Sequence, residues 1–415
     1  MTTATTTTAA ATVNVGKFRA AVKNIAAATN PKNAAASQEM AFTVNNDTLT
    51  VAHDGIDFHA SVILPAENAT NGTMRVTAHK FNKLLTNLLG SNTKKVNAAN
   101  LPLSAHNEEI TTCFDGMNLS IPQPEHASNA DSMCITSKTD HVATLATVAA
   151  SHLHAAYNRI NHAACEDDTL PMICSINLTL HHGELVFHAT DRFRAAEYKA
   201  AATVEDGAFD HDTHLVSADA YKHLVALLPN DDTEVTISLV NVSGVGAKQA
   251  LRFDTHNTTV IARHLDGEFP NLSPLWPATA RHMFTVDRKT LEAATKKLGK
   301  LSDRSSRIVF HSSGDRVELT TETDSDGRAS THLETTLAAM DDAESITFGL
   351  SSTYLLQLVK AFDCERMAVA LTEPHRPVVF FDANHDVTVL EDGELDVRSA
   401  SVDQRELLMP QRLAA

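Results

Sequence analysis

The stretch Val76-Thr77-Ala78-His79-Lys80-Phe81-Asn82-Lys83-Leu84-Leu85 joins an apolar residue, a capping residue and an amphipathic helix. A threonine hydroxyl can accept a hydrogen bond from the free N–H groups of a first helical turn. Val76-Thr77 therefore predicts the end of a strand and the start of a helix. Apolar residues then recur at helical spacing at Phe81, Leu84, Leu85, Leu88 and Leu89.

The same apolar-plus-cap pair recurs six times along the chain, at Val13-Asn14, Val76-Thr77, Ile135-Thr136, Val216-Ser217, Val286-Asp287 and Leu350-Ser351. The spacings between the caps are 63, 59, 81, 70 and 64 residues. Five of the pairs place a bulky apolar residue four positions after the cap, whereas the third has Asp140 there and resumes the pattern at Val142. This near-even recurrence indicates an internal repeat. The alternative is a generic α+β protein with unrelated domains.

Short alternating segments between these helices predict strands, for example at residues 48–52, 184–187, 235–240, 316–320 and 367–371. The repeat unit is therefore about one helix plus four strands, occurring twice in each of three similar domains. We expect an α+β fold with a disordered Thr/Ala-rich tail at 1–11 and domains at 12–130, 131–277 and 278–415. The boundaries lie in the Pro- or Ser/Ala-rich segments 124–132 and 274–282.

Composition excludes several classes of protein. The 415 residues are 43% hydrophobic and 20% charged, which suits a globular chain, and no apolar run approaches the ~18 residues of a membrane span. The five cysteines are odd in number and never in CxxC spacing, which favours reduced thiols in a cytoplasmic protein over disulfides or a cysteine zinc site.

The net charge of −17 disfavours nucleic acid only if the positive residues are scattered. They gather instead on the predicted helices, at Lys17, Arg19, Lys23, His79, Lys80, Lys83, Lys222, His223, Arg288, Lys289, Lys296, Lys297 and Lys300. Acidic residues concentrate in strands and loops. This segregation suits helices that face a polyanion, with binding that is non-specific and salt-dependent. The alternative is that these lysines form ordinary solvated helix faces.

Catalytic motifs are absent from the sequence. The closest histidine groups are His181-His182, His152 with His154, and His211 with His214, and none shows zinc-site spacing. There is no GxxxxGK[ST], GxGxxG or GxSxG pattern. We therefore expect no metal, no cofactor and no catalytic activity, and a binding or structural role.

Four stretches carry unusual binding capacity without catalytic character. His188-Ala-Thr-Asp-Arg-Phe-Arg-Ala-Ala196 follows a strand and packs two arginines and an aromatic residue into a turn, although a charged hairpin end with solvated arginines would look the same. Residues 265–277 form a Pro- and aromatic-rich connector, and 372–377 a proline-punctuated turn. The apolar terminus 406–413 suits either a final strand or an adaptable peptide-binding groove.

Together these segments resemble the bacterial sliding clamps, the processivity (beta) subunits of the replicative DNA polymerase. Ala189-Thr-Asp-Arg-Phe-Arg194 resembles the family's ATDxxR turn, 265–270 its LDxxFP segment and 408–413 its C-terminal MPxR[L] motif. The resemblance also includes Asp167-Asp-Thr-Leu-Pro171, and it is weakest in residues 30–130.

The resemblance implies three similar domains per subunit, closed head to tail as a homodimeric ring around duplex DNA, with helices lining the hole. It implies a peptide-binding cleft between the middle and last domains, formed by Ile173, Thr190, Arg192, Phe193, Arg194, Pro270, Leu275, Ser351, Tyr354, Pro377, Met409, Pro410 and Arg412. DNA-facing residues would be Lys17, Lys23, Lys32, Lys80, Lys83, Lys222, Lys296 and Lys297. Leu119 and Leu301 would lie at the subunit interface.

The implied partners are double-stranded DNA bound without sequence preference, the replicative polymerase, the clamp loader and repair polymerases, in the cytoplasm at the nucleoid. Ala195, His375 and Pro377 depart from the family pattern and should reshape one wall of the cleft, with Ala195 leaving a deeper pocket. Two alternative functions remain open from the sequence: a His/Asp metal-dependent hydrolase on repeated domains, and a monomeric peptide-binding scaffold.

Overall fold

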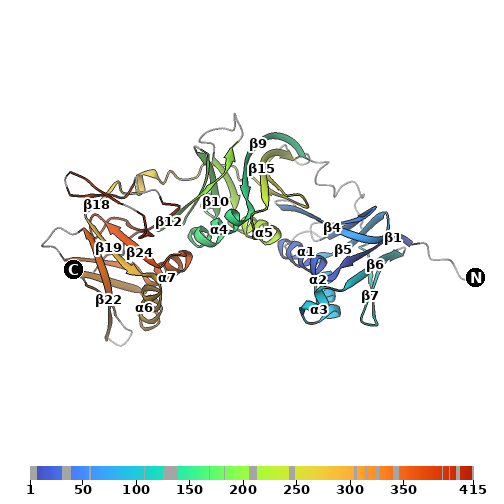
Figure 1. Cartoon of the computed structure of the whole chain (residues 1–415), viewed down its shortest axis with the longest axis horizontal. Coiled ribbons are helices and arrows are strands. Elements are labelled where there is room, and N and C mark those ends of the chain that lie inside the picture. The colour runs from blue at the N-terminus through green and yellow to red at the C-terminus, as the bar shows by residue number, and fades with distance from the viewer. Residues whose placement is uncertain are drawn as a thin grey trace, which may run out of the picture. The chain divides into compact units, whose positions relative to one another are not determined.

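The computed structural model describes residues 7–29, 39–55, 58–106, 108–124, 139–167, 169–181, 183–204, 213–242, 248–302, 306–313, 316–322, 327–339, 345–385, 387–391, 393–398 and 402–413. The chain forms two compact units. Unit 1 comprises 1–154, 202–210 and 219–265, and unit 2 comprises 155–201, 211–218 and 266–415. Each unit is built on one long antiparallel sheet (Figure 1).

Unit 1 contains a 13-stranded sheet whose main path is β13-β9-β15-β16-β17-β4-β1-β6-β7-β8, with β2, β3 and β5 attached through β4. Its elements are β1 (Thr7–Asn14), α1 (Val15–Ala28), β2 (Glu39–Asn45), β3 (Thr48–Asp54), β4 (Phe58–Thr70), β5 (Gly72–Thr77), α2 (Ala78–Leu89), α3 (Lys94–Asn97), β6 (Asn100–His106), β7 (Glu109–Phe114), β8 (Met117–Pro122), β9 (Thr139–Ala149), β13 (Thr203–Val204), α5 (Ala218–Leu227), β15 (Glu234–Val242), β16 (Lys248–Asp254) and β17 (Thr258–Arg263). Helix α4 (Ala150–Ile160) begins in unit 1 and ends in unit 2.

Unit 2 contains a 12-stranded sheet, ordered β14-β10-β11-β12-β28-β25-β24-β19-β22-β21-β20-β23, and the small sheet β18-β27-β26. Its elements are η4 (Asn161–Ala163), β10 (Ser175–His181), β11 (Glu184–Thr190), β12 (Arg194–Ala201), β14 (Thr213–Ser217), η5 (Ser273–Leu275), β18 (Thr279–Ala280), β19 (His282–Asp287), α6 (Arg288–Leu301), β20 (Arg307–Ser313), β21 (Arg316–Glu322), β22 (Arg328–Ala339), β23 (Ile346–Ser351), α7 (Ser352–Ala361), β24 (Arg366–Leu371), β25 (Val378–Asp382), β26 (Thr388–Val389), β27 (Leu395–Asp396) and β28 (Gln404–Leu408).

The helices begin where the capping residues predict. Asn14, Asp287 and Ser351 each accept a hydrogen bond from the backbone N–H three residues later, which satisfies one free donor of the first turn. The apolar stripe of α1 is buried, as are Phe81, Leu85 and Leu89 of α2. The sequence pattern therefore identified the start of these helices and most of their inward faces, although the Thr77 side chain makes no capping hydrogen bond and Leu84 of the predicted α2 stripe is 38% exposed.

The third predicted cap, Ile135-Thr136, lies outside the described residues, but the helix expected directly after it was wrong. Residues 139–149, where the pattern placed the opening of the third helix, form strand β9, and α4 starts only at Ala150. The residue before α4 is Ala149, which has no side-chain acceptor and so gave no capping signal in the sequence. With this correction, the residues that precede α1, α2, α4, α5, α6 and α7 are 63, 72, 68, 70 and 64 positions apart. The repeat is therefore more regular than predicted.

The predicted disordered tail also extends too far. Residues 7–11 belong to β1, which pairs with β4 on one side and β6 on the other. Ala9 and Ala11 are buried, so the alternating small side chains of this low-complexity segment serve a strand. The α+β fold is confirmed, whereas the three domain boundaries stay a prediction.

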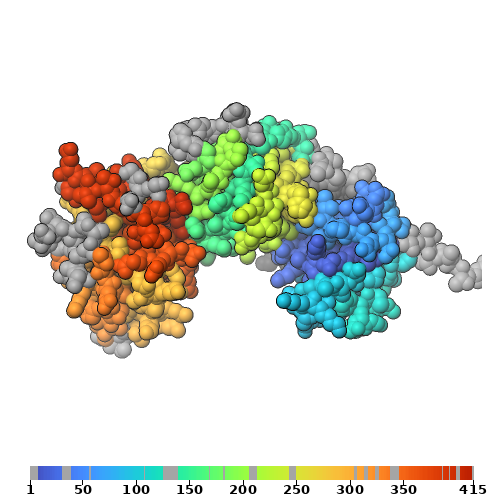
Figure 2. Space-filling model, viewed as in Figure 1, coloured from blue at the N-terminus to red at the C-terminus, as the bar shows by residue number. Residues whose placement is uncertain are grey.

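The same antiparallel strand pairing occurs in both units. In unit 1, β17 pairs antiparallel with β4, and Val260 lies opposite Ala60. In unit 2, β28 pairs in the same way with β12, and Glu406 lies opposite Ala196. The last strand of the second and of the third predicted domain thus joins the long strand of the domain before it. The space-filling view shows the red C-terminal residues abutting the green residues of β11 and β12 (Figure 2).

Among the described residues, no helix is long and apolar enough to cross a membrane.

Candidate functional site

The turn between β11 and β12 is fixed by its own side chains. The Asp191 carboxylate accepts the N–H groups of Phe193 and Arg194 at 3.0 and 3.1 Å. The Thr190 hydroxyl accepts the N–H of Arg192 at 3.2 Å and donates to the carbonyl of Arg194 at 2.7 Å. Arg192 has a φ of +80°, a left-handed conformation that costs a non-glycine residue roughly 1–2 kcal/mol. The hydrogen bonds hold this conformation, and we call residues 190–194 the Asp191 turn.

Arg194 is engaged inside the protein. Its Nε donates to Asp191 at 2.9 Å, its Nη1 donates to the side-chain oxygen of Gln357, and its guanidinium lies 4.3 Å from the ring centroid of Tyr354. Burial raises the pKa of the Tyr354 hydroxyl, and the nearby Asp191 carboxylate raises it further. Arg194 is buried, so it joins the turn to α7 and holds the surface above it in place.

The exposed side of the turn meets the chain's C-terminal segment, Met409–Leu413. The N–H of Met409 donates to the carbonyl of Phe193 at 2.8 Å, and these two apolar side chains are 37% and 54% exposed. The segment continues along β23, where the N–H of Gln411 donates to the carbonyl of Gly349 at 2.8 Å. A side chain at Gly349 would lie 2.9 Å from Leu413, so glycine permits this close approach.

The remaining residues of the predicted cleft are placed around this core. Ser351 caps α7 by accepting the N–H of Tyr354, and Pro377 immediately precedes Val378, which lies opposite Leu408. The carbonyl of Arg412 accepts a hydrogen bond from Arg307 at 2.8 Å. Ile173 is buried, while Pro270 and Leu275 are exposed on the connector. The structure thus links Thr190, Arg192, Phe193, Arg194, Ser351, Tyr354 and Met409 through hydrogen bonds or ring contacts. Pro270, Leu275 and Pro377 adjoin them through chain neighbours, Pro410 and Arg412 follow Met409, and Ile173 makes no direct contact with this group among the described interactions.

Ala195 does not open a deeper pocket, contrary to the sequence-based expectation. It is 1% exposed, in a core cluster with Leu272, Trp276 and Leu407. The connector therefore covers the space that the smaller side chain leaves. His375, the second departure, lies on the surface and pairs with Glu373 at 3.0 Å.

A buried ionic network lies beneath this surface, and the sequence did not predict it. Glu197 of β12 contacts His188 at 3.1 Å and Arg405 of β28 at 2.8 Å. Burial alone would raise the pKa of the Glu197 carboxyl, but the His188 hydrogen bond and the Arg405 charge lower it to about 2. Glu406 is held similarly by His162 at 2.9 Å. The available signal was charged residues, Glu197 in β12 and Arg405-Glu406 in β28, within strands that also carry runs of apolar residues.

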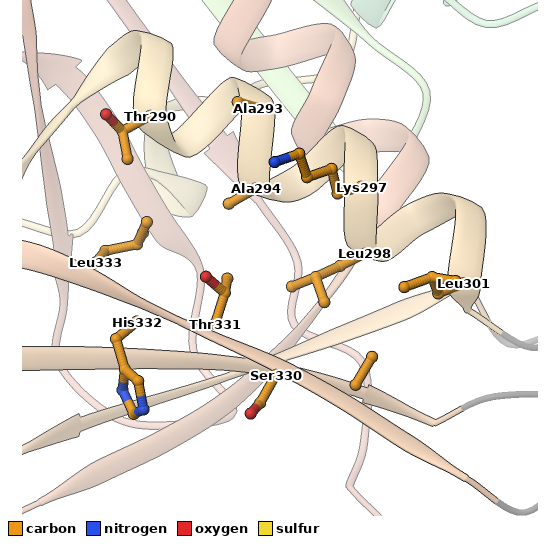
Figure 3. Close-up of a pocket in the computed structure, with 11 residues that line it drawn as sticks. Thr290, Ala293, Ala294, Lys297, Leu298, Leu301, Ser330, Thr331, His332 and Leu333 are labelled. Atoms are coloured by element: carbon orange, nitrogen blue, oxygen red, sulfur yellow. The ribbon is translucent and has the colours of Figure 1, made fainter.

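A second feature of unit 2 is a groove between α6 and β22, about 330 Å³ in volume, which we call the α6 groove (Figure 3). Its α6 side presents Lys297, Leu298 and Leu301, and its β22 side presents residues 329–333. Leu301, predicted at the subunit interface, is 54% exposed here. Leu119, its predicted counterpart, is half-buried on β8 in unit 1.

The predicted DNA-facing lysines are exposed on helices, namely Lys17 and Lys23 on α1, Lys80 and Lys83 on α2, Lys222 on α5, and Lys296 and Lys297 on α6. Lys32 lies outside the described residues. Lys297 also lines the α6 groove, which sets it apart from the other lysines. The described part of the chain contains no group of three or more His, Cys, Asp or Glu side chains that could hold a metal ion.

Comparison with known proteins matches residues 147–271 to the DNA polymerase III beta subunit, central domain, and residues 274–391 to its C-terminal domain. The chain is 18% identical over 350 residues to the beta sliding clamp of Chlamydia trachomatis, covering 83% of this chain and 77% of the relative. It is 22% identical over 231 residues to that of Bacillus subtilis, covering 55% of this chain and 58% of the relative.

Solved structures share the fold over nearly the whole chain. The DNA polymerase III beta subunit of Thermotoga maritima superposes with a TM-score of 0.79 at 16% identity, covering 98% of this chain and 100% of that one. The sliding clamp of Pseudomonas aeruginosa gives 0.78 at 17% identity, with the same coverage.

Proposed function

This chain belongs to the bacterial sliding clamp family, the beta subunits of DNA polymerase III, and we propose that two copies close head to tail into a ring around duplex DNA. In this proposal the ring is held on DNA by topology, without a catalytic activity of its own. It would act at the nucleoid in the cytoplasm. Helices would face the DNA, and the Asp191 turn with the C-terminal segment would receive partner peptides.

Ring closure is supported by a strand pairing that occurs twice, whereas a third equivalent strand lacks this partner within the described residues. The long strands are β4, β12 with β13, and β22, and each pairs with the strand that precedes α1, α4 or α6 respectively. Counted back from that pairing, Ala60, Ala196 and Ala329 occupy the same position. The first two are fully buried, by β17 and β28 respectively. Ala329 is only partly buried, and within the described chain residues 328–334 of β22 pair only with β21.

The complementary edge is β8, the last strand of the first predicted domain. Leu119 is equivalent to Val260 and Glu406 in the other two predicted domains. The residues opposite them in the neighbouring strand are Thr112, Phe253 and Phe380, which hold the same position in the three hairpins. Those two counterparts are 0% and 2% exposed, whereas Leu119 is half-buried and Met117 is 54% exposed. In the described residues, β8 pairs only with β7. One open long strand and one open last strand are what a head-to-tail closure by a second copy requires.

The repeat also fixes the register of this pairing. Val260 faces Ala60 and Glu406 faces Ala196, so Leu119 of one subunit should face Ala329 of its partner. Leu301 and Ala329 line the same α6 groove, so in this proposal both predicted interface leucines would lie at one junction.

The charge distribution supports DNA as the enclosed partner. Exposed lysines lie on α1, α2, α5 and α6 in a chain whose net charge is −17. Attraction between these helices and phosphates would be independent of base sequence and would weaken with salt. A closed ring does not need strong attraction, because linkage retains it.

The Asp191 turn supports a peptide-binding role. Phe193 and Met409 present apolar surface beside the exposed charge of Arg192, on a backbone fixed by four turn hydrogen bonds. Such a surface suits an extended peptide with leucine and phenylalanine side chains, from the polymerase, the clamp loader or repair polymerases.

The test of the ring is a disulfide at the inferred register. A variant with Leu119→Cys and Ala329→Cys should form a covalent dimer on mild oxidation, because facing residues of paired strands have Cβ atoms about 5 Å apart. The control, Leu119→Cys with Ser330→Cys, shifts one side chain to the opposite face and should not cross-link. Each single variant controls for the native cysteines. Dimer by light scattering but no selective cross-link would refute the register, and a concentration-independent monomer would favour a scaffold that never closes.

A further inference from the structure

The first helix of each predicted domain carries a hydrogen-bond donor at one equivalent position. Asn24 of α1, Arg159 of α4 and Lys297 of α6 each lie ten residues after the residue that precedes the helix. Asn24 and Arg159 lie at junctions with a helix of the following domain, and their surroundings indicate what Lys297 would contact.

Asn24 binds the end of a helix from the next domain. Its side-chain amide donates to the carbonyl of Ala226, in the last turn of α5. The last carbonyls of a helix lack partners within the helix, so they accept such donors. Beside this contact, Phe58 packs edge-on against His223 with ring centroids 6.0 Å apart, which fills the junction.

Arg159 occupies the same place in unit 2. It lines a cavity of about 120 Å³ together with Phe362 and Asp363, the two residues that directly follow α7. Its guanidinium also lies 4.8 Å from the ring centroid of Tyr198. At both junctions within the chain, the donor therefore lies at the C-terminal end of the second helix of the following domain.

Within the described residues, no following domain meets Lys297. It is exposed and lines the α6 groove with Leu301 and Ala329. By the same rule its counterpart is α2, the second helix of the first domain, in another copy. Thr86 of α2 is equivalent to Ala226, and the last turn of α2 has no basic residue of its own. Arg19 of α1 donates to the Gly90 carbonyl at 3.2 Å and the Gly90 N–H to that of Thr86 at 3.0 Å, so Lys297 would add a second cation at this helix end. A helix C-terminus carries partial negative charge that a nearby ammonium group stabilises.

A second copy is also the occupant that the apolar surface favours. Leu84 of α2 is 38% exposed, although its equivalents Leu224 of α5 and Leu358 of α7 are fully buried. The α6 groove combines Leu298 and Leu301 with the open edge of β22. Exposed apolar side chains thus occur on both surfaces that ring closure would bring together.

We propose that Lys297 is a ring-closing residue, whose ammonium group binds the C-terminal end of helix α2, at residues 86–90, of a second copy of this chain. This inference rests on the proposed head-to-tail ring and separates Lys297 from the predicted DNA-facing lysines. Lys297 would contribute to subunit affinity, while its neighbour Lys296 would not.

The experiment is the dimer dissociation constant of the full chain by sedimentation, without DNA, for wild type and four variants. Lys297→Ala should weaken the dimer roughly five-fold, the size of a favourable charge–helix-end contact, and Lys297→Glu by more than ten-fold. Lys297→Arg, which copies Arg159, should stay within about two-fold of wild type. Lys296→Glu is the matched control on the same helix and should leave the constant unchanged.

The outcomes separate this inference from the ring itself. A wild-type dimer with equal constants for Lys297→Glu and Lys296→Glu overturns the role of Lys297 and leaves the ring standing. A wild type that stays monomeric at every concentration overturns the ring. Because Lys297 is exposed, an unchanged melting curve for each variant at a concentration where all are monomeric shows that a weakened dimer is not a folding defect.

Discussion

At the residue scale, this chain concentrates ionisable groups where two domains share a sheet. Glu197 and Glu406 are 4% and 2% exposed, and each has a histidine within hydrogen-bonding distance. A buried carboxylate without partners would be strongly destabilising, so these contacts are required once the residues are there. At the equivalent positions the junction in unit 1 carries Ser61 and Val260, so the two junctions differ in chemistry although they share one register.

Glu197 predicts an acid-dependent loss of stability. Its folded-state pKa is depressed to about 2 from 4.5, so its contribution is present above pH 4.5 and is lost as pH falls through about 2. Linkage makes this contribution about 3 kcal/mol. Glu197→Gln should be less stable than wild type by about that amount at pH 7, and the gap should close between pH 4.5 and 2. Urea unfolding across this range measures it, with Glu391→Gln, an exposed carboxylate of the same unit, as control. A gap that is independent of pH would contradict the assignment.

At the element scale, the sequence predicted what is local and missed what is long-range. Five of the six starts of the repeat helices, which exclude the one-turn α3, could be predicted because an acceptor side chain or a strand-to-helix change of period marks them, as at Asn14 and Asp287. The start of α4 could not, because Ala149 leaves no such mark. The pairing of β12 with β28 joins residues about two hundred positions apart, so no local pattern specifies it. The α6 groove that Lys297 lines depends on how α6 packs against β22, which no local pattern specifies either.

The C-terminal segment is the element whose role in peptide binding is most readily isolated. Met409 is exposed, and its backbone is held by Phe193, so shortening its side chain removes surface without releasing the strand. Met409→Ala should lower affinity for a leucine- and phenylalanine-containing peptide roughly ten-fold, as expected for one exposed apolar anchor. The dimer should be unchanged. Val389→Ala, at an exposed apolar residue in the small sheet, is the control. Equal peptide affinity in the two variants, measured by fluorescence anisotropy, would remove Met409 from the binding surface.

At the scale of the whole molecule, one repeated junction accounts for features that otherwise look unrelated. The proposed closure would explain why Ala329 is less buried than Ala60 and Ala196, and why Leu301 and Met117 are exposed. Within the described residues, the edges of β22 and β8 lack the partner that the equivalent strands have. Two copies would complete both openings.

We propose that the protein holds DNA by enclosing it, and the most direct test is its retention on circular and linear DNA of the same sequence. The dimer, loaded onto nicked circular plasmid and washed at high salt, should remain bound, because salt screens attraction but does not undo linkage. A single restriction cut should then release it from the free ends. Loss from the intact circle at high salt, or persistence after the cut, would contradict enclosure.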